Sequence, residues 1–293
     1  MTSPTTSRTR TSRPVAAVVS GLLALTVLAA AAGPVAAADP EVPTASTTTS
    51  RSVSVVSMNP AKLNLFVSAG FRFQDPNYNA CTATSVMDML NFIYLGGTGG
   101  AGFKWTTRLG GAARDSILAW ERTHDTLAGG YGSDPHGWRN ALNYYGWGTA
   151  ALYAGSRVYD DRAYATYDRA IKSAVRALIR YRKPVGIVAW AGRHAQMITG
   201  YDGLVGDPFD KDDSGHYTNT FTISAVYLSD PLQSQAIVNK RITYSELKSS
   251  SNLKLRFRPY LETDSPYDDP YTSGTIPARD EWYGKFVIVQ PIR

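Results

Sequence analysis

Residues 167–201, YDRAIKSAVRALIRYRKPVGIVAWAGRHAQMITGY, run through a helix, a break and two strands in direct succession. In 167–182 the apolar side chains recur on one side of a helix; they are Ala170, Ile171, Ala174, Val175, Leu178 and Ile179. Pro184 cannot continue a helix. The apolar runs 185–190 and 194–201 then predict two strands joined by a short Ala-Gly-Arg turn.

The second of these strands carries a histidine with a defined orientation. Strand alternation places His194, Gln196 and Ile198 on one face, and the residues between them on the other. The other three histidines stand in polar or Gly- and Pro-containing segments; they are His124, His136 and His216. His194 is therefore the candidate general base. A histidine that is merely hydrogen-bonded in the core is the alternative.

Cys81 is the only cysteine in the sequence. Apolar residues after it follow helical spacing until Gly96-Gly97, and Asn79 is the expected N-cap. Cys81 would then lie in the first turn, where free N–H groups and the helix dipole favour a thiolate. The sequence around the helix leaves two interpretations open, a nucleophile or a small hydrophobic residue in the core.

An aspartate is the natural partner to orient the imidazole of a catalytic histidine. Residues 220–228 predict a strand that leads into Asp230-Pro231. Asp207-Pro208 is a second candidate, but it follows a loop-like segment. We prefer Asp230 because the end of a strand holds a side chain more rigidly than a loop does. An ordinary Asp-Pro turn is the alternative for both.

The first 38 residues have the pattern of an export signal. Three arginines precede an apolar run over 15–32, and small residues follow over 35–38. This order predicts a signal peptide cleaved near Ala38 and a secreted protein. An uncleaved membrane anchor is the alternative. No other stretch is apolar enough to cross a membrane, so we expect no stable membrane insertion after cleavage.

The rest of the chain is expected to hold a flexible Thr- and Ser-rich leader over 39–57 and one domain over 58–293. Residues 1–38 contain three arginines and no acidic residue, so their removal lowers the formal net charge from +6 to +3. The basic residues are scattered, which argues against nucleic-acid binding. The segment that begins at Asp210 starts like a calcium loop, but Phe221 occupies the position that requires a glutamate. We expect neither a metal nor a cofactor.

Several phrases, in this order, resemble the papain-like cysteine peptidase superfamily, and within it the bacterial branch around the bacteriocin-leader (double-glycine) peptidases and their secreted relatives. The resemblance spans about residues 70–290. The phrases are Gln74–Cys81 with the helix behind it, Gly137–Gly146, Lys183–Val185, His194–Tyr201, Val226–Pro231 and Trp282–Val289.

The resemblance implies an α+β, papain-like fold, in which an N-terminal helical part with the cysteine helix packs against a mainly antiparallel β-sheet. It implies Cys81 as nucleophile, His194 as base and acid, and Asp230 as the residue that orients the imidazole. Gln74 would donate its amide to an oxyanion hole shared with the Cys81 backbone N–H. Thr82 stands where relatives often have glycine.

The function implied is that of a secreted thiol protease, which hydrolyses peptide bonds through a Cys-His-Asp triad. Two alternatives share the same residues: a papain-fold acyltransferase or cell-wall amidase, and a catalytically inactive binding domain. The expected partner is a peptide or protein substrate, with cell-wall peptide as one option. We expect a monomer.

Overall fold

The computed structural model describes residues 59–126, 132–250, 253–257 and 281–293. The predicted signal peptide and the predicted leader lie outside the described residues. Residues 96–102 contain turns and neither helix nor strand. All described elements belong to one unit, Ser54–Arg293.

Within the described residues, seven strands form one sheet, and every neighbouring pair is antiparallel. The order is β2-β7-β3-β4-β5-β6, and β1 pairs with β4 outside this path. The strands are β1 (Lys62–Asn64), β2 (Tyr159–Tyr164), β3 (Val185–Ala189), β4 (His194–Asp202), β5 (Ala225–Ser229), β6 (Lys240–Thr243) and β7 (Phe286–Pro291).

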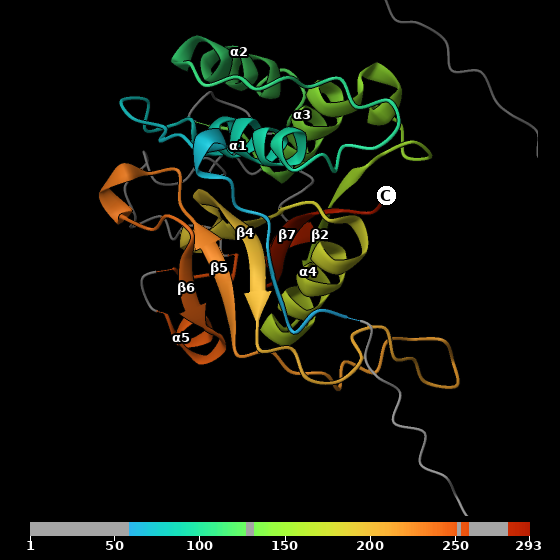
Figure 1. Ribbon diagram of the computed structural model, residues 1–293. Coiled ribbons are helices and arrows are strands. Elements are labelled where there is room, and N and C mark those ends of the chain that lie inside the picture. The colour runs from blue at the N-terminus through green and yellow to red at the C-terminus, as the bar shows by residue number, and fades with distance from the viewer. Residues whose placement is uncertain (1–58, 127–131, 251–252, 258–280) are drawn as a thin grey trace, which may run out of the picture. The chain divides into compact units, whose positions relative to one another are not determined.

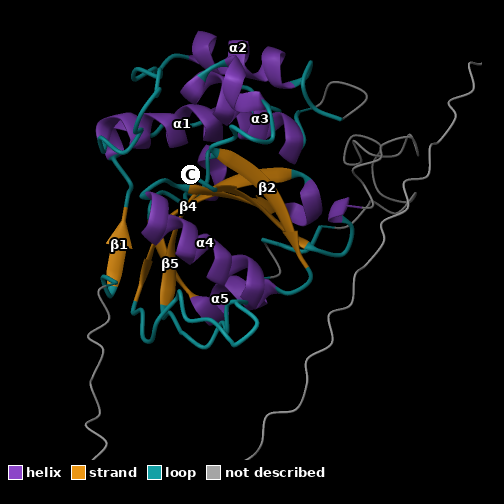
Figure 2. Ribbon diagram, turned by 90° about the vertical axis from the view of Figure 1, so that its right-hand side faces the viewer, coloured by secondary structure: helices purple, strands orange, loops and turns teal. Residues whose placement is uncertain are grey.

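Helices cover both faces of this sheet. Figure 2 shows α1, α2 and α3 on one side of the sheet and α4 and α5 on the other, and Figure 1 shows the same layers from another direction. The helices are α1 (Cys81–Leu95), α2 (Gly111–Glu121), α3 (Pro135–Trp147), α4 (Tyr167–Tyr181) and α5 (Tyr244–Ser249). Short 3-10 turns lie at Ser68–Gly70, Thr149–Leu152, Trp190–Gly192 and Gln233–Gln235.

Strand alternation divides the core into two layers. Met197 of β4 packs in the cluster with α1, α2 and α3, whereas Ile198 packs in the cluster with α4. Successive side chains on a strand point to opposite faces, so a sheet covered on both sides is apolar on both. The molecule is therefore α+β, with a mainly antiparallel sheet and the cysteine helix packed on β4.

Helix α4 closely matches the predicted helix over 167–182. Thr166 caps it, because its hydroxyl accepts a hydrogen bond from the Arg169 N–H at 3.3 Å. The helix ends at Tyr181, since Arg182 has a left-handed φ of 53°. Its apolar stripe is buried against the sheet, as the periodicity predicted.

Helix α1 begins at Cys81, but the predicted N-cap is wrong. Ala80 is the N-cap, and it has no side-chain hydrogen bond. Asn77 organises the turn instead: its side-chain oxygen accepts from the Asn79 N–H at 3.2 Å, and its carbonyl accepts from the Ala80 N–H at 3.1 Å. An Asn two residues further upstream therefore satisfies the donors ahead of the helix.

Two strand boundaries differ from the predicted ones. The strand predicted over 185–190 stops at Ala189, because Trp190 has a left-handed φ of 51°. The strand predicted over 220–228 begins only at Ala225, and the residues before it contribute an isolated bridge between Thr222 and Val205. Residues 220–224 have the composition of a strand, but the pairing of β4 with β5 ends at Ala225. Strand formation there depends on a partner strand as well as on local β-propensity.

Candidate active site

The Cys81 side chain lies at the amino end of α1 and is 8 % exposed. The first bond of the helix runs from the Thr84 N–H to the Ala80 carbonyl at 2.8 Å. The N–H groups of Cys81, Thr82 and Ala83 are thus outside the hydrogen-bond ladder of the helix. They place the positive end of the helix dipole beside Cys81.

His194 is the first residue of β4, and its side chain is buried. Its Nε2 lies 2.7 Å from Oδ1 of Asp230. Cys81 lies close enough to the ring to raise the pKa of His194. Because Asp230 engages Nε2, Nδ1 is the ring nitrogen available to the sulfur. The structure therefore brings Cys81, His194 and Asp230 together, with the imidazole between the sulfur and the carboxylate.

Asp230 directly follows β5 and is fully buried. Besides His194 it accepts hydrogen bonds from the Gln196 amide at 2.5 Å and from the Leu232 N–H at 2.7 Å. These donors hold the carboxylate in one orientation. The alternative residue, Asp207, lies on an exposed loop and accepts from the Phe209 N–H at 2.9 Å.

The charge of His194 follows from these neighbours. Burial lowers the pKa of His194, but the hydrogen bonds to Asp230 and Cys81 outweigh burial and raise that pKa to about 9. At neutral pH the ring is therefore a buried imidazolium between a carboxylate and a sulfur. This arrangement suits an ion pair between a thiolate and an imidazolium.

Trp190 lies over the imidazole of His194. The two rings stack with their centroids 4.2 Å apart and an interplanar angle of 22°. Trp190 and Ala191 both have left-handed φ, at 51° and 59°. Their N–H groups donate at 2.7 Å to the carbonyls of Leu253 and Lys254. A neighbouring segment therefore holds this uncommon backbone conformation and keeps the indole against the imidazole.

Gln74 is buried and joins the cysteine loop to the aspartate loop. Its backbone N–H donates to the Pro231 carbonyl at 2.7 Å, and its side-chain amide donates to the Tyr78 carbonyl at 2.8 Å. Arg114 of α2 in turn donates to the Gln74 carbonyl at 2.7 Å. The amide thus holds the loop before Cys81, and its predicted place in an oxyanion hole stays a prediction.

The sequence analysis assigned no role at this site to three residues that the structure places there. Gln196 was foreseeable, since strand alternation puts it on the face of His194. Trp190 had no signal, because its position depends on a left-handed hairpin turn. Glu121 had none either: it lies 39 residues after Thr82, yet its carboxylate accepts the Thr82 hydroxyl at 2.7 Å beside Cys81.

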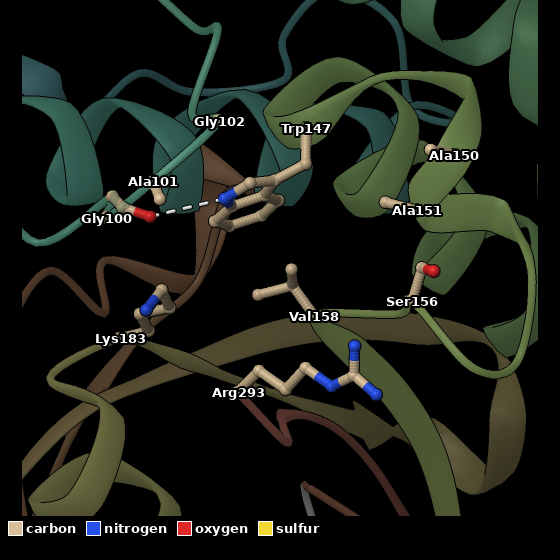
Figure 3. A pocket seen from close by; sticks show the side chains of 11 residues that line it. Gly100, Ala101, Gly102, Trp147, Ala150, Ala151, Ser156, Val158, Lys183 and Arg293 are labelled. Carbon is tan, nitrogen blue, oxygen red and sulfur yellow. Dashed lines mark hydrogen bonds between the residues drawn. The ribbon is translucent and has the colours of Figure 1, made fainter.

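A pocket of about 400 Å³ lies apart from the candidate active site. Its lining does not include Cys81, His194, Asp230 or Gln74. Figure 3 shows the Trp147 indole in this pocket between a glycine-containing loop and Val158, with Lys183 and Arg293 below. Among the residues that the structure describes, the Lys183 amine has only the Tyr181 carbonyl as a hydrogen-bond partner, at 3.4 Å. Burial lowers the pKa of Lys183.

Among the described residues, one group of side chains has ligand atoms close enough to hold a metal: His136, Asp161 and Glu281. Nε2 of His136 lies 3.4 Å from an oxygen of each carboxylate. Arg139 forms an ion pair with the other oxygen of Asp161. Side chains of this group thus already act as partners for one another and for Arg139.

Comparisons with known proteins give no further guide. No protein-family model, no curated protein and no solved structure matches this chain. In the part of the chain that the structure describes, no helix is long and apolar enough to cross a membrane.

Proposed function

We propose that the chain is a secreted cysteine peptidase of the papain-like kind, which hydrolyses peptide bonds through Cys81, His194 and Asp230. The observation that carries the proposal is the buried hydrogen bond between His194 and Asp230, together with Cys81 beside the same imidazole ring. A core histidine needs one partner to be satisfied. This one joins a thiol at a helix amino end to a triply hydrogen-bonded carboxylate.

In the acylation step, the Cys81 thiolate attacks the carbonyl carbon of the scissile amide, and the carbonyl π electrons move to oxygen. When the tetrahedral intermediate collapses, the C–N bond breaks and the His194 imidazolium gives its proton to the leaving amine. In deacylation, neutral His194 takes a proton from water as the water oxygen attacks the thioester. The C–S bond breaks, a carboxylic acid leaves, and the thiolate–imidazolium pair returns.

Developing charge on the carbonyl oxygen needs donors that are already oriented. The free N–H groups in the first turn of α1 supply such donors next to the sulfur, at the positive end of the helix dipole. In the proposal, the Gln74 amide joins these donors when substrate is bound, in place of its 3.4 Å hydrogen bond to the Asn77 carbonyl. Removal of one such donor typically lowers kcat by about a hundredfold or more.

The test compares Cys81→Ala and His194→Ala with wild type on peptide and on peptidoglycan substrates. Each substitution is expected to lower kcat/KM at least about a thousandfold, because triad members act as a unit. His216→Ala is the matched control, since this histidine is exposed in a loop. Full activity of either triad variant would contradict the proposal.

The same test separates the alternatives. Cleavage of peptidoglycan but not of peptides would favour a cell-wall amidase, and product transfer to an added amine would favour an acyltransferase. Wild-type Cys81 that reacts with iodoacetamide no faster than a free thiol at pH 6 would favour an inactive binding domain, since an ion-paired thiolate alkylates quickly.

A further inference from the structure

Glu121 is a fully buried carboxyl group next to the cysteine helix. It is the last residue of α2, and its Oε2 accepts a hydrogen bond from the Thr82 hydroxyl at 2.7 Å. Thr82 follows Cys81 directly and is itself buried. Oε1 of Glu121 has no hydrogen-bond partner among the described residues. A buried carboxyl with an open oxygen requires an explanation.

The surroundings of Glu121 disfavour a negative charge. Burial, together with the nearby Cys81, Asp125 and Asp134, raises the pKa of Glu121 well above its usual value, against the opposing effect of the Thr82 hydrogen bond. The ionisable groups that act on Glu121 are thus acids from α1, from the turn after α2 and from the start of α3.

A neutral carboxylic acid suits this position for two reasons. It can both donate and accept a hydrogen bond, so it holds the Thr82 hydroxyl without ionising. It also places no negative charge beside the sulfur, where a carboxylate would oppose the thiolate. Thr82, which stands where relatives often have glycine, points its hydroxyl to α2 and has a hydrogen-bonded place in the core.

We propose that Glu121 is a positioning residue, which fixes the first turn of α1 through Thr82 and so holds Cys81 against His194. This inference rests on the proposed role of Cys81 as the nucleophile. Glu121 acts through Thr82 and takes no proton from the substrate. The pair explains how a β-branched residue after the cysteine is compatible with an ordered helix start.

The test measures how fast neutral iodoacetamide and anionic iodoacetate alkylate the full chain at pH 6. Cys81 is the only cysteine, so the bound label reports this site alone. Thr82→Val and Glu121→Leu are expected to slow both reagents about tenfold, the effect of one lost buried hydrogen bond with its partner left unpaired. Thr82→Ser, which keeps the hydroxyl, should restore the rate.

The charge of Glu121 is read from the ratio of the two rates, because a carboxylate near the sulfur repels only iodoacetate. Glu121→Gln keeps a neutral hydrogen-bonding side chain and should keep this ratio within about threefold of wild type. Asp88→Asn is the matched control: Asp88 is another fully buried carboxyl, on α1 itself, and it accepts from the Arg72 N–H at 3.1 Å.

Each of the following outcomes would overturn the inference. An alkylation rate unchanged in both Thr82→Val and Glu121→Leu removes the positioning role, and so does an equal loss in Asp88→Asn. A ratio that shifts more than threefold in Glu121→Gln shows a charged Glu121. If His194→Ala alkylates as fast as wild type, the proposed nucleophile fails, and the inference fails with it. Loss in His194→Ala without loss in the Thr82 and Glu121 variants refutes Glu121 alone.

Discussion

At the scale of single residues, the charge of Asp230 sets the behaviour of His194. An asparagine at 230 still accepts a hydrogen bond but has no charge, so Asp230→Asn should lower the pKa of His194 from about 9 by more than one unit. Histidine-selective NMR titration measures this pKa directly, with His194→Ala to assign the signal. Asp207→Asn is the control, because Asp207 has no contact with the ring. An unchanged midpoint in Asp230→Asn would refute the assignment.

At the scale of elements, α3 fits β3 only because Gly186 has no side chain. A Cβ at Gly186 would lie 2.4 Å from the Trp138 ring, and Trp138 is fully buried. Gly186→Ala should therefore lower the free energy of unfolding by about 1–3 kcal/mol through overpacking. Urea denaturation measures the loss. Gly155→Ala is the control, since nothing lies within 4 Å of its Cβ position; equal stability of both variants would contradict this packing.

At the scale of the whole molecule, three buried groups make stability fall as pH rises. Burial raises the pKa of Asp88 and of Glu121 well above 3.8 and 4.5. Their contributions are complete below those ordinary values and decline as pH rises toward the folded-state pKa. The contribution of His194 is complete below about 6.5 and is lost as pH rises through about 9.

These directions of pKa change predict that the urea concentration at the midpoint of unfolding decreases between pH 5 and pH 9. The double variant Asp88→Asn and Glu121→Gln should show a shallower slope, because its amides do not titrate. In His194→Ala, the decrease of the urea midpoint above pH 6.5 should be smaller than in wild type. A slope that is the same in wild type and in the double variant would mean that neither carboxyl is protonated in the folded state.

The sequence by itself determined the elements whose signal is local. The stripe of α4, the alternation of β4 and the place of Cys81 in the first turn of α1 depend on residues a few positions apart, and the structure has each of them. The order of Cys81, His194 and Asp230 along the chain also identified residues that the structure brings together: His194 and Asp230 share a hydrogen bond, and Cys81 lies beside the same ring.

Only the tertiary structure decided the features that join distant segments. The Asn77 turn replaced the expected cap, pairing with β4 shortened the strand before Asp230, and a left-handed turn placed Trp190 on His194. The contact of Thr82 with Glu121 links two helices across 39 positions. Such contacts depend on packing between elements, and the periodicity of one segment contains no information on which side chain of another will face it.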